Sequence, residues 1–410
     1  MVTAGVYLLL RASPLLEYSS TPLLVITWIG ALTAFFGASS ALLQNDLKRV
    51  IAYSTCSQLG YLVMSVGLSN YSTSLFHLVN HAYFKALLFL SAGAVIHALN
   101  DEQDMRKMGG LVQLLPFTYT NILIGSLSLM ALPFLTGFYS KDFILEVAYG
   151  RYLFTGGIAY WLGTLTAIIT AFYSFRLIAL TFLTFPNGTK TNYLHAHEPS
   201  MVMSLPLIVL ALASILIGYL TKDMFIGLGS HLFSHSLFTH PNHLSLIEAE
   251  FAIPFFYLIL PVVGSLLGGF FGWFLYEGGI SSSSSSQPLA LYSASAKGQR
   301  WRIRAYIFLN QKYHFDNIYN NIIVSFFLNF AFVTHKILDR GAIEFIGPYG
   351  LLHFFTRTSR TFARFDTALP IPTHALYIIL AFILFLTEIF LIGDPKLIFV
   401  ILASFALFAG

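Results

Sequence analysis

The chain alternates between long apolar stretches and short polar connections. The apolar stretches fall at about residues 1–11, 22–43, 49–68, 74–98, 115–138, 154–183, 201–220, 253–276 and 374–393, with a shorter one at 397–409. Most of them reach the roughly 20 residues that an α-helix needs to cross a bilayer. The first, at 1–11, is too short to cross alone. The pattern predicts an all-α polytopic membrane protein with about eight full spans.

The span at 115–138 is expected to be discontinuous. Pro133 removes a backbone donor and Gly137 loosens the helix. Broken helices are tolerated inside membranes where the freed backbone groups line a cavity. Lys141 and Asp142 follow directly, and the sequence is apolar again as far as Ala148.

The character of the chain changes after the span that ends near 276. A serine run at 281–286 and the basic segment KGQRWRIR are typical of a flexible linker. From 316 onward, polar side chains recur at helical spacing, which favours an amphipathic helix lying along the membrane surface and kinked at Gly347 and Pro348. A soluble two-helix hairpin is the alternative.

Four parts are therefore expected. They are a transmembrane bundle at 1–276, a linker at 277–315, a lateral amphipathic helix at 316–372 and a C-terminal transmembrane anchor at 373–410.

The composition also indicates a protein embedded in a lipid bilayer. Hydrophobic residues make up 56% of the chain and charged residues 10%, against about 25% charged residues in a typical soluble domain. The single cysteine, Cys56, excludes a disulfide framework and a cysteine-ligated iron–sulfur cluster within this chain. The net charge of +4 is too diffuse to indicate nucleic-acid binding.

The basic residues divide unequally between the two sides of the predicted spans. If the spans alternate, one side holds only Arg11, Lys141, Arg151, Lys222 and Lys396. The other holds Lys48, Arg49, Arg106, Lys107, Lys190 and the Lys and Arg residues of 298–364. The positive-inside rule places this second side, and with it the lateral helix, on the matrix or cytoplasmic face.

The strongest candidate site lies in the span at 74–98. His77, His81 and Lys85 are spaced four apart, so they share one face of the helix. Lys85 lies too far from either surface to snorkel, and an ammonium at that depth costs about 2.5–3.5 kcal/mol. Histidine and a desolvated lysine can both take up and release protons. A buried proton path is favoured over a structural set of polar residues. A metal site is not expected, because that face of the helix carries no carboxylate or cysteine.

Lys141 and Asp142 form the second candidate site, directly after the expected break. They either belong to a polar pathway or act as an interfacial anchor and a helix cap, and the spacing alone does not decide between them. Arg176, near the end of its span, is expected to snorkel. The sequence contains no P-loop, Rossmann glycine run or nucleophile elbow, so no nucleotide or redox chemistry is expected in this chain.

Three long segments carry a resemblance to a known family. They are LQNDLKRVIAYSTCSQLGY, FHLVNHAYFKALLFLSAGAVIHALNDEQDMRKMGG and PFLTGFYSKDFILE, and the later KYHFDNIYNNIIV and LDRGAIEFIGPYG agree with them. They resemble the subunit 5 family of mitochondrial NADH:ubiquinone oxidoreductase, respiratory complex I. This family belongs to the antiporter-like subunits, which are related to multisubunit cation/proton antiporters. The resemblance covers nearly the whole chain.

The resemblance implies roles for the candidate residues. Lys85 matches the central proton-channel lysine of the family, and His77 and His81 match the histidines beside it. Lys141 matches the lysine of the broken helix through which protons are thought to exit, with Asp142 beside it. The implied function is proton translocation in the membrane arm, coupled to electron transfer from NADH to ubiquinone. A cation/proton antiporter subunit and a non-pumping structural brace are the alternatives.

The resemblance also implies partners and location. NADH, flavin, iron–sulfur clusters and ubiquinone are expected in other subunits of the complex, with no cofactor or metal in this chain. The expected partners are neighbouring antiporter-like subunits along the lateral helix and membrane lipids, in the mitochondrial inner membrane, with the lateral helix on the matrix side. Because the family begins well upstream of Met1, a split subunit is expected, with the N-terminal half a separate chain; a partial gene model is the alternative.

Overall fold

All regular structure in the described residues is helical. The computed structural model describes residues 2–227, 230, 232–233, 236–244, 246–278, 296–368 and 370–391. They form two compact units, Met1–His314 and Phe315–Gly410. The predicted all-α fold is confirmed, and the serine run at 281–286 and the stretch at 397–409 lie outside the described residues.

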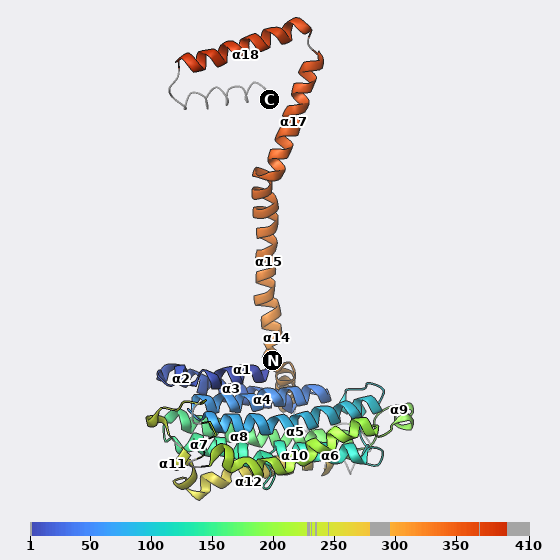
Figure 1. Cartoon of the computed structure of the whole chain (residues 1–410). Coiled ribbons are helices and arrows are strands. Elements are labelled where there is room, and N and C mark those ends of the chain that lie inside the picture. Colours follow the sequence, from blue (N-terminus) through green and yellow to red (C-terminus); the bar gives the residue numbers. More distant parts are fainter. Residues whose placement is uncertain are drawn as a thin grey trace. The chain divides into compact units, whose positions relative to one another are not determined.

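The first unit is a bundle in which six long helices pack side by side (Figure 1). They are α3 (Ser20–Leu42), α4 (Leu47–Gly67), α5 (Tyr71–Ala98), α8 (Phe154–Ile178), α10 (Met201–Ile226) and α12 (Phe255–Trp273). Two of them continue in π-helical turns, α8 through η3 (Ala179–Leu183) and α12 through η5 (Phe274–Gly278). These bounds agree with the predicted spans to within a few residues, except that α10 ends at Ile226 rather than at 220.

Shorter elements complete the first unit. They are α1 (Val2–Arg11), α2 (Ser13–Leu16), η1 (Met105–Lys107), α6 (Pro116–Leu129), η2 (Phe138–Asp142), α7 (Phe143–Gly150), α9 (Lys190–His195), η4 (Pro241–His243), α11 (Leu246–Phe251), α13 (Ala296–Asn310) and η7 (Lys312–His314). Although α1 is short, it is part of the bundle. Its Val6 and Leu10 are buried in a cluster with Leu62 of α4 and Tyr71 of α5.

Six helices among the described residues are long and apolar enough to cross a membrane. They are Ser20–Leu42, Tyr71–Ala98, Phe154–Leu183, Met201–Ile226, Phe255–Tyr276 and Lys312–Arg364. The helix α4 is not among them although it lies in the middle of the bundle. Its polar side chains lower its hydropathy, and several of them, Ser54, Ser57, Gln58 and Ser65, are buried inside the bundle.

The second unit is a row of helices in which none of the residues 315–364 is buried. Its elements are α14 (Phe315–Ile318), η8 (Tyr319–Val324), α15 (Ser325–Val333), η9 (Thr334–Ile343), α16 (Glu344–Ile346), α17 (Pro348–Ala368) and α18 (Ile371–Leu391). The expected kink is confirmed, because Gly347 leaves the helical region with φ −89° and ψ −121°. An apolar window inside Lys312–Arg364 is also long enough to span, so the lateral placement of this helix stays a prediction.

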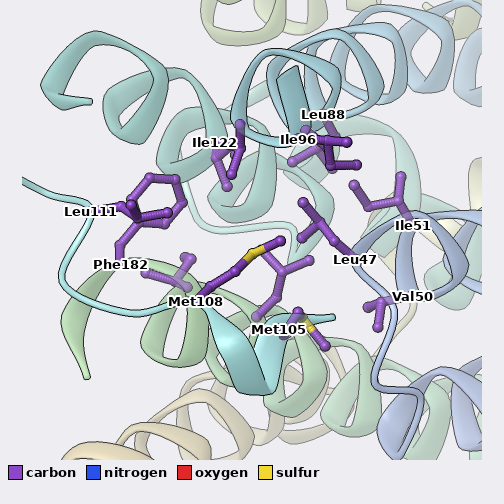
Figure 2. Close-up of a cluster of buried hydrophobic side chains, with 14 of the residues drawn as sticks. Leu47, Val50, Ile51, Leu88, Ile96, Met105, Met108, Leu111, Ile122 and Phe182 are labelled. Atoms are coloured by element: carbon purple, nitrogen blue, oxygen red, sulfur yellow. The ribbon is translucent and has the colours of Figure 1, made fainter. Parts of the chain in front are cut away.

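A charged connection closes one end of the bundle. Between α5 and α6, the side chains of Met105, Met108 and Leu111 point into the largest buried cluster, beside Leu47 of α4 and Phe182 of η3 (Figure 2). The charged side chains of the same connection stay outside and pair with each other, Arg106 with Asp104 at 2.6 Å and Lys107 with Glu102 at 3.0 Å. The loop is therefore part of the core and not only a solvated turn.

At another connection, a buried carboxylate joins three elements. Glu17, after α2, has a fully buried side chain, and it accepts hydrogen bonds from the Tyr71 hydroxyl at 2.8 Å and the His240 backbone N–H at 3.1 Å. His243 Nδ1 lies 2.7 Å from the same carboxylate. Burial by itself raises the pKa of Glu17, but the bonds from His243, Tyr71 and His240 outweigh it and hold the pKa below its usual value.

The helices α3 and α4 approach each other too closely for side chains at four glycines, Gly30, Gly37, Gly60 and Gly67. A Cβ at Gly60 would overlap the backbone of Ala34, and one at Gly30 would overlap the backbone of Met64. Small residues at such positions let helix backbones pack directly in membranes.

Gly60→Ala is therefore expected to lower the thermal stability of the detergent-solubilised protein. Backbone atoms cannot move aside, so overpacking costs about 1–3 kcal/mol. Gly93→Ala is the matched control, because nothing lies within 4 Å of a Cβ at Gly93 in α5. Equal melting temperatures for the two variants would contradict the packing argument.

Glu17→Gln should destabilise the protein in a pH-dependent way. Because the pKa of Glu17 is lowered in the folded state, its carboxylate stabilises the fold at pH values above the unfolded-state pKa of about 4.3. That stability is lost as the pH falls through the lowered folded-state pKa. The difference in melting temperature between wild type and Glu17→Gln should be largest near pH 7 and vanish at acid pH. Glu250→Gln, at an exposed carboxylate, should show no such trend.

Candidate functional site

The site is organised by a break between two helices. The helix α6 ends at Leu129, and the chain then passes through two left-handed residues, Ala131 with φ 66° and Phe134 with φ 72°. It resumes as the π-helical turn η2, which leads into α7. The discontinuity predicted from Pro133 and Gly137 is confirmed.

The role of Gly137 is spatial. A Cβ at this position would overlap the carbonyl oxygen of Ser128, so glycine permits the chain to fold back against the end of α6. The break is fixed on α10 through Thr136, whose hydroxyl donates to the carbonyl of Ala213 at 3.3 Å and accepts from the N–H of Gly218 at 3.2 Å. Because both bonds go to backbone atoms, they hold the segment in one position.

His77, His81 and Lys85 lie inside the bundle, as predicted from their common face. Their exposed fractions are 0%, 3% and 4%. The Nζ of Lys85 donates to the hydroxyl of Ser54 and, at 3.3 Å, to the carbonyl of Ile51, both on α4. The rings of His77 and His81 have centroids 6.0 Å apart. The three side chains therefore form one buried row along α5.

His77 links this row to the break. Its Nδ1 lies 2.9 Å from the Ser140 hydroxyl on η2, and its Nε2 lies 3.2 Å from Oε1 of Gln58 on α4. Ser140 immediately precedes Lys141 in the π-helical turn. His77 is thus hydrogen-bonded to the Ser140 hydroxyl, and Ser140 is the residue directly before Lys141.

Lys141 is 1% exposed, so its side chain lies inside the bundle and not on its surface. Its Nζ donates to the Thr170 hydroxyl on α8 at 2.9 Å and lies 3.5 Å from the carbonyl of Leu129, which the end of α6 leaves free. The same Nζ lies 5.5 Å from the ring centroid of Tyr61. The cation site is therefore built from a broken-helix carbonyl, a hydroxyl and an aromatic face.

Asp142 does not cap the following helix through its side chain. It is 4% exposed, and its Oδ2 has no hydrogen-bond partner in the described part of the chain. Lys141 and Asp142 are thus two buried titratable groups at successive positions of η2, and the Lys141 ammonium contacts Thr170, Leu129 and Tyr61. Buried groups of this kind can take up and release protons.

Arg176 corrects one expectation. It is 5% exposed and does not snorkel. Its guanidinium donates to the carbonyl of Gln44 at 2.6 Å and to Oδ1 of Asn45 at 3.3 Å, and it lies over the ring of Tyr276. Arg176 thus ties α8 to the turn between α3 and α4.

Several polar residues at the site were not singled out from the sequence. They are Ser54, Gln58 and Tyr61 on α4, Ser140 on η2 and Thr170 on α8. A signal did exist for the first three, whose spacing of four and then three places them on one face of α4. The described residues hold no group of three His, Cys, Asp or Glu side chains arranged to bind a metal.

Comparison with known proteins agrees with the resemblance seen in the motifs. Residues 1–170 match the family model for the NADH:quinone oxidoreductase/Mrp antiporter transmembrane region. NADH-ubiquinone oxidoreductase chain 5 of Rhizopus stolonifer is 58% identical over 402 residues, covering 98% of this chain and 60% of the relative. The chain 5 protein of Cryptococcus neoformans is 55% identical, covering 96% and 58%. That of Marchantia polymorpha is 47% identical, covering 99% and 60%.

The chain spans about 60% of the length of these relatives. The agreement extends through both helical units, since it covers nearly every residue of this chain. Over nearly its whole length, the chain is similar in sequence to chain 5 of NADH-ubiquinone oxidoreductase.

Proposed function

We propose that this chain is a proton-translocating subunit of the membrane arm of NADH:ubiquinone oxidoreductase. In this role it moves protons while electrons pass from NADH to ubiquinone in other subunits. The observation that carries the proposal is the buried row of His77, His81 and Lys85 on α5, whose His77 is hydrogen-bonded to Ser140 beside Lys141 at the helix break.

The proposed route has distinct parts. Lys85 holds a proton in the middle of the bundle, where Ser54 and the carbonyl of Ile51 accept from its ammonium. His81 and His77 pass the proton toward η2. Lys141 and Asp142 take part in its release, because both are buried titratable groups at the helix break.

The surroundings follow from the same proposal. The chain lies in the mitochondrial inner membrane, with the lateral helix on the matrix side and in contact with neighbouring antiporter-like subunits. Flavin, iron–sulfur clusters, NADH and ubiquinone bind elsewhere in the complex. The short charged connections containing Lys48, Arg49, Arg106 and Lys107 support this orientation through the positive-inside rule.

One other function has a specific observation in its favour. The matching family model also names Mrp antiporters, so a cation/proton antiporter subunit is the second candidate. The sequence identity of 47–58% to NADH-ubiquinone oxidoreductase chain 5 over nearly the whole chain favours the first.

Lys85→Met tests the central residue. Methionine keeps the length and apolar volume but cannot carry a proton, and losing a general acid–base group slows its step by roughly 100-fold. The number of protons pumped per NADH oxidised by the assembled complex in vesicles should fall, while Lys190→Met, at an exposed position of α9, should leave it unchanged. Unchanged pumping by assembled Lys85→Met would refute the proposed function.

Thr170→Val tests the exit end. The substitution keeps the side-chain shape and removes the hydroxyl 2.9 Å from Nζ of Lys141. Loss of a charged buried hydrogen bond should slow proton release about tenfold, measured as the pumping rate at saturating NADH. Thr181→Val is the matched control, because that hydroxyl donates to the Leu177 carbonyl of its own helical segment at 2.7 Å. Equal pumping by the two variants would exclude Thr170 from the path.

A further inference from the structure

A buried glutamine lies at the junction between the histidine row and the break. Gln58 is 0% exposed, and its Oε1 lies 3.2 Å from Nε2 of His77. Its Nε2 has no hydrogen-bond partner among the described residues. Buried amide nitrogens are normally paired, so an unpaired one points to a second arrangement of this side chain.

Ser140, on the other side of the His77 ring, also has two choices. Its hydroxyl lies 2.9 Å from Nδ1 of His77 and 3.3 Å from the carbonyl of Thr136, one turn earlier. A hydroxyl has one proton to donate and can accept at the same time. It can therefore donate to the ring or turn to the carbonyl and accept from the ring.

The ring has three states, and each needs different partners. With its proton on Nε2, neutral His77 donates to Oε1 of Gln58 and accepts from Ser140. As imidazolium, it donates on both sides, so Ser140 turns to the Thr136 carbonyl. With its proton on Nδ1, it donates to Ser140, and its Nε2 then needs a donor.

Only a turned amide supplies that donor. The oxygen and nitrogen ends of a carboxamide have nearly the same shape, so a half-turn of Gln58 places its NH₂ group against Nε2 of His77. The turn also gives a partner to the amide nitrogen that is otherwise unpaired. Gln58 and Ser140 together can satisfy the ring in all three states.

We propose that Gln58 is a positioning residue whose amide turns with the protonation state of His77. The proposal rests on the proton path proposed above and deepens it. In the proposed step an N–H bond of His81 breaks as an N–H bond forms at Nε2 of His77, and the N–H bond at Nδ1 breaks as its proton passes to the Ser140 hydroxyl, whose own proton moves on toward Lys141. The amide and the hydroxyl rotate so that both ring nitrogens of His77 keep a hydrogen-bond partner at every step.

Other titratable groups surround this triad of Gln58, His77 and Ser140. His81 and Lys85 are on α5, Lys141 and Asp142 are on η2, and Tyr61 is on α4 below the Lys141 ammonium. They contribute to the pH dependence of pumping in every variant of Gln58. The informative measurement is therefore the change in the pH profile relative to wild type.

Two variants of Gln58 test the proposal in the assembled complex in vesicles. Gln58→Met has nearly the same length but neither donates nor accepts, so it should slow pumping about tenfold. Gln58→Glu, once ionised, only accepts, so it holds the proton on His77. Pumping by Gln58→Glu should therefore need higher pH, with the profile displaced upward relative to wild type.

Gln44→Met is the matched control, since Gln44 is 2% exposed and donates to the Asn310 carbonyl at 3.1 Å, away from the row. It should leave the pH profile unchanged. Wild-type pumping and profile in Gln58→Met would overturn the proposal. If Gln58→Met does not assemble, the isosteric Gln58→Glu is the test, and a pH profile of pumping equal to that of wild type would also overturn the proposal.

The Lys85→Met variant separates the two proposals. If it stops pumping while both Gln58 variants behave as wild type, the proton path stands and the role of Gln58 is wrong. If Lys85→Met pumps normally, the path itself is wrong.

Discussion

The burial of Lys85 is the constraint on which the rest of this structure depends. An ammonium in a bilayer needs oxygen acceptors, and lipid offers none at that depth. The acceptors come from α4, through Ser54 and the carbonyl of Ile51. The helix α4 turns these acceptors toward α5, and it is held against α3 by direct backbone contact at Gly60.

The second lysine is accommodated by a different device. An intact helix uses its carbonyls internally and has none to spare for a cation. By ending α6 at Leu129, the chain frees a carbonyl within 3.5 Å of Lys141, and Thr170 and Tyr61 complete the surroundings. The break therefore supplies a hydrogen-bond acceptor inside the bundle from the backbone alone, without a further polar side chain.

Much of this architecture could be predicted from the sequence, because bilayer spans and Pro or Gly breaks leave strong local signals. The row of His77, His81 and Lys85 was predicted from spacing alone. Contacts between distant segments could not be predicted in this way. Lys141 and Arg176 each look like interfacial residues until the fold shows their partners, Thr170 and Gln44. Gln58 could not be recognised from the sequence, because its role depends on a contact with the His77 ring, 19 positions away.

The connection between α5 and α6 has a practical consequence. Its charges suggest a place where an affinity tag or a protease site could be inserted, as surface loops usually allow. Met105 and Met108, however, are sealed among Leu47, Leu111 and Phe182. An insertion there would pull the methionines out of the core and loosen the ends of four helices together. The exposed stretch at 189–191 is a better place for a label.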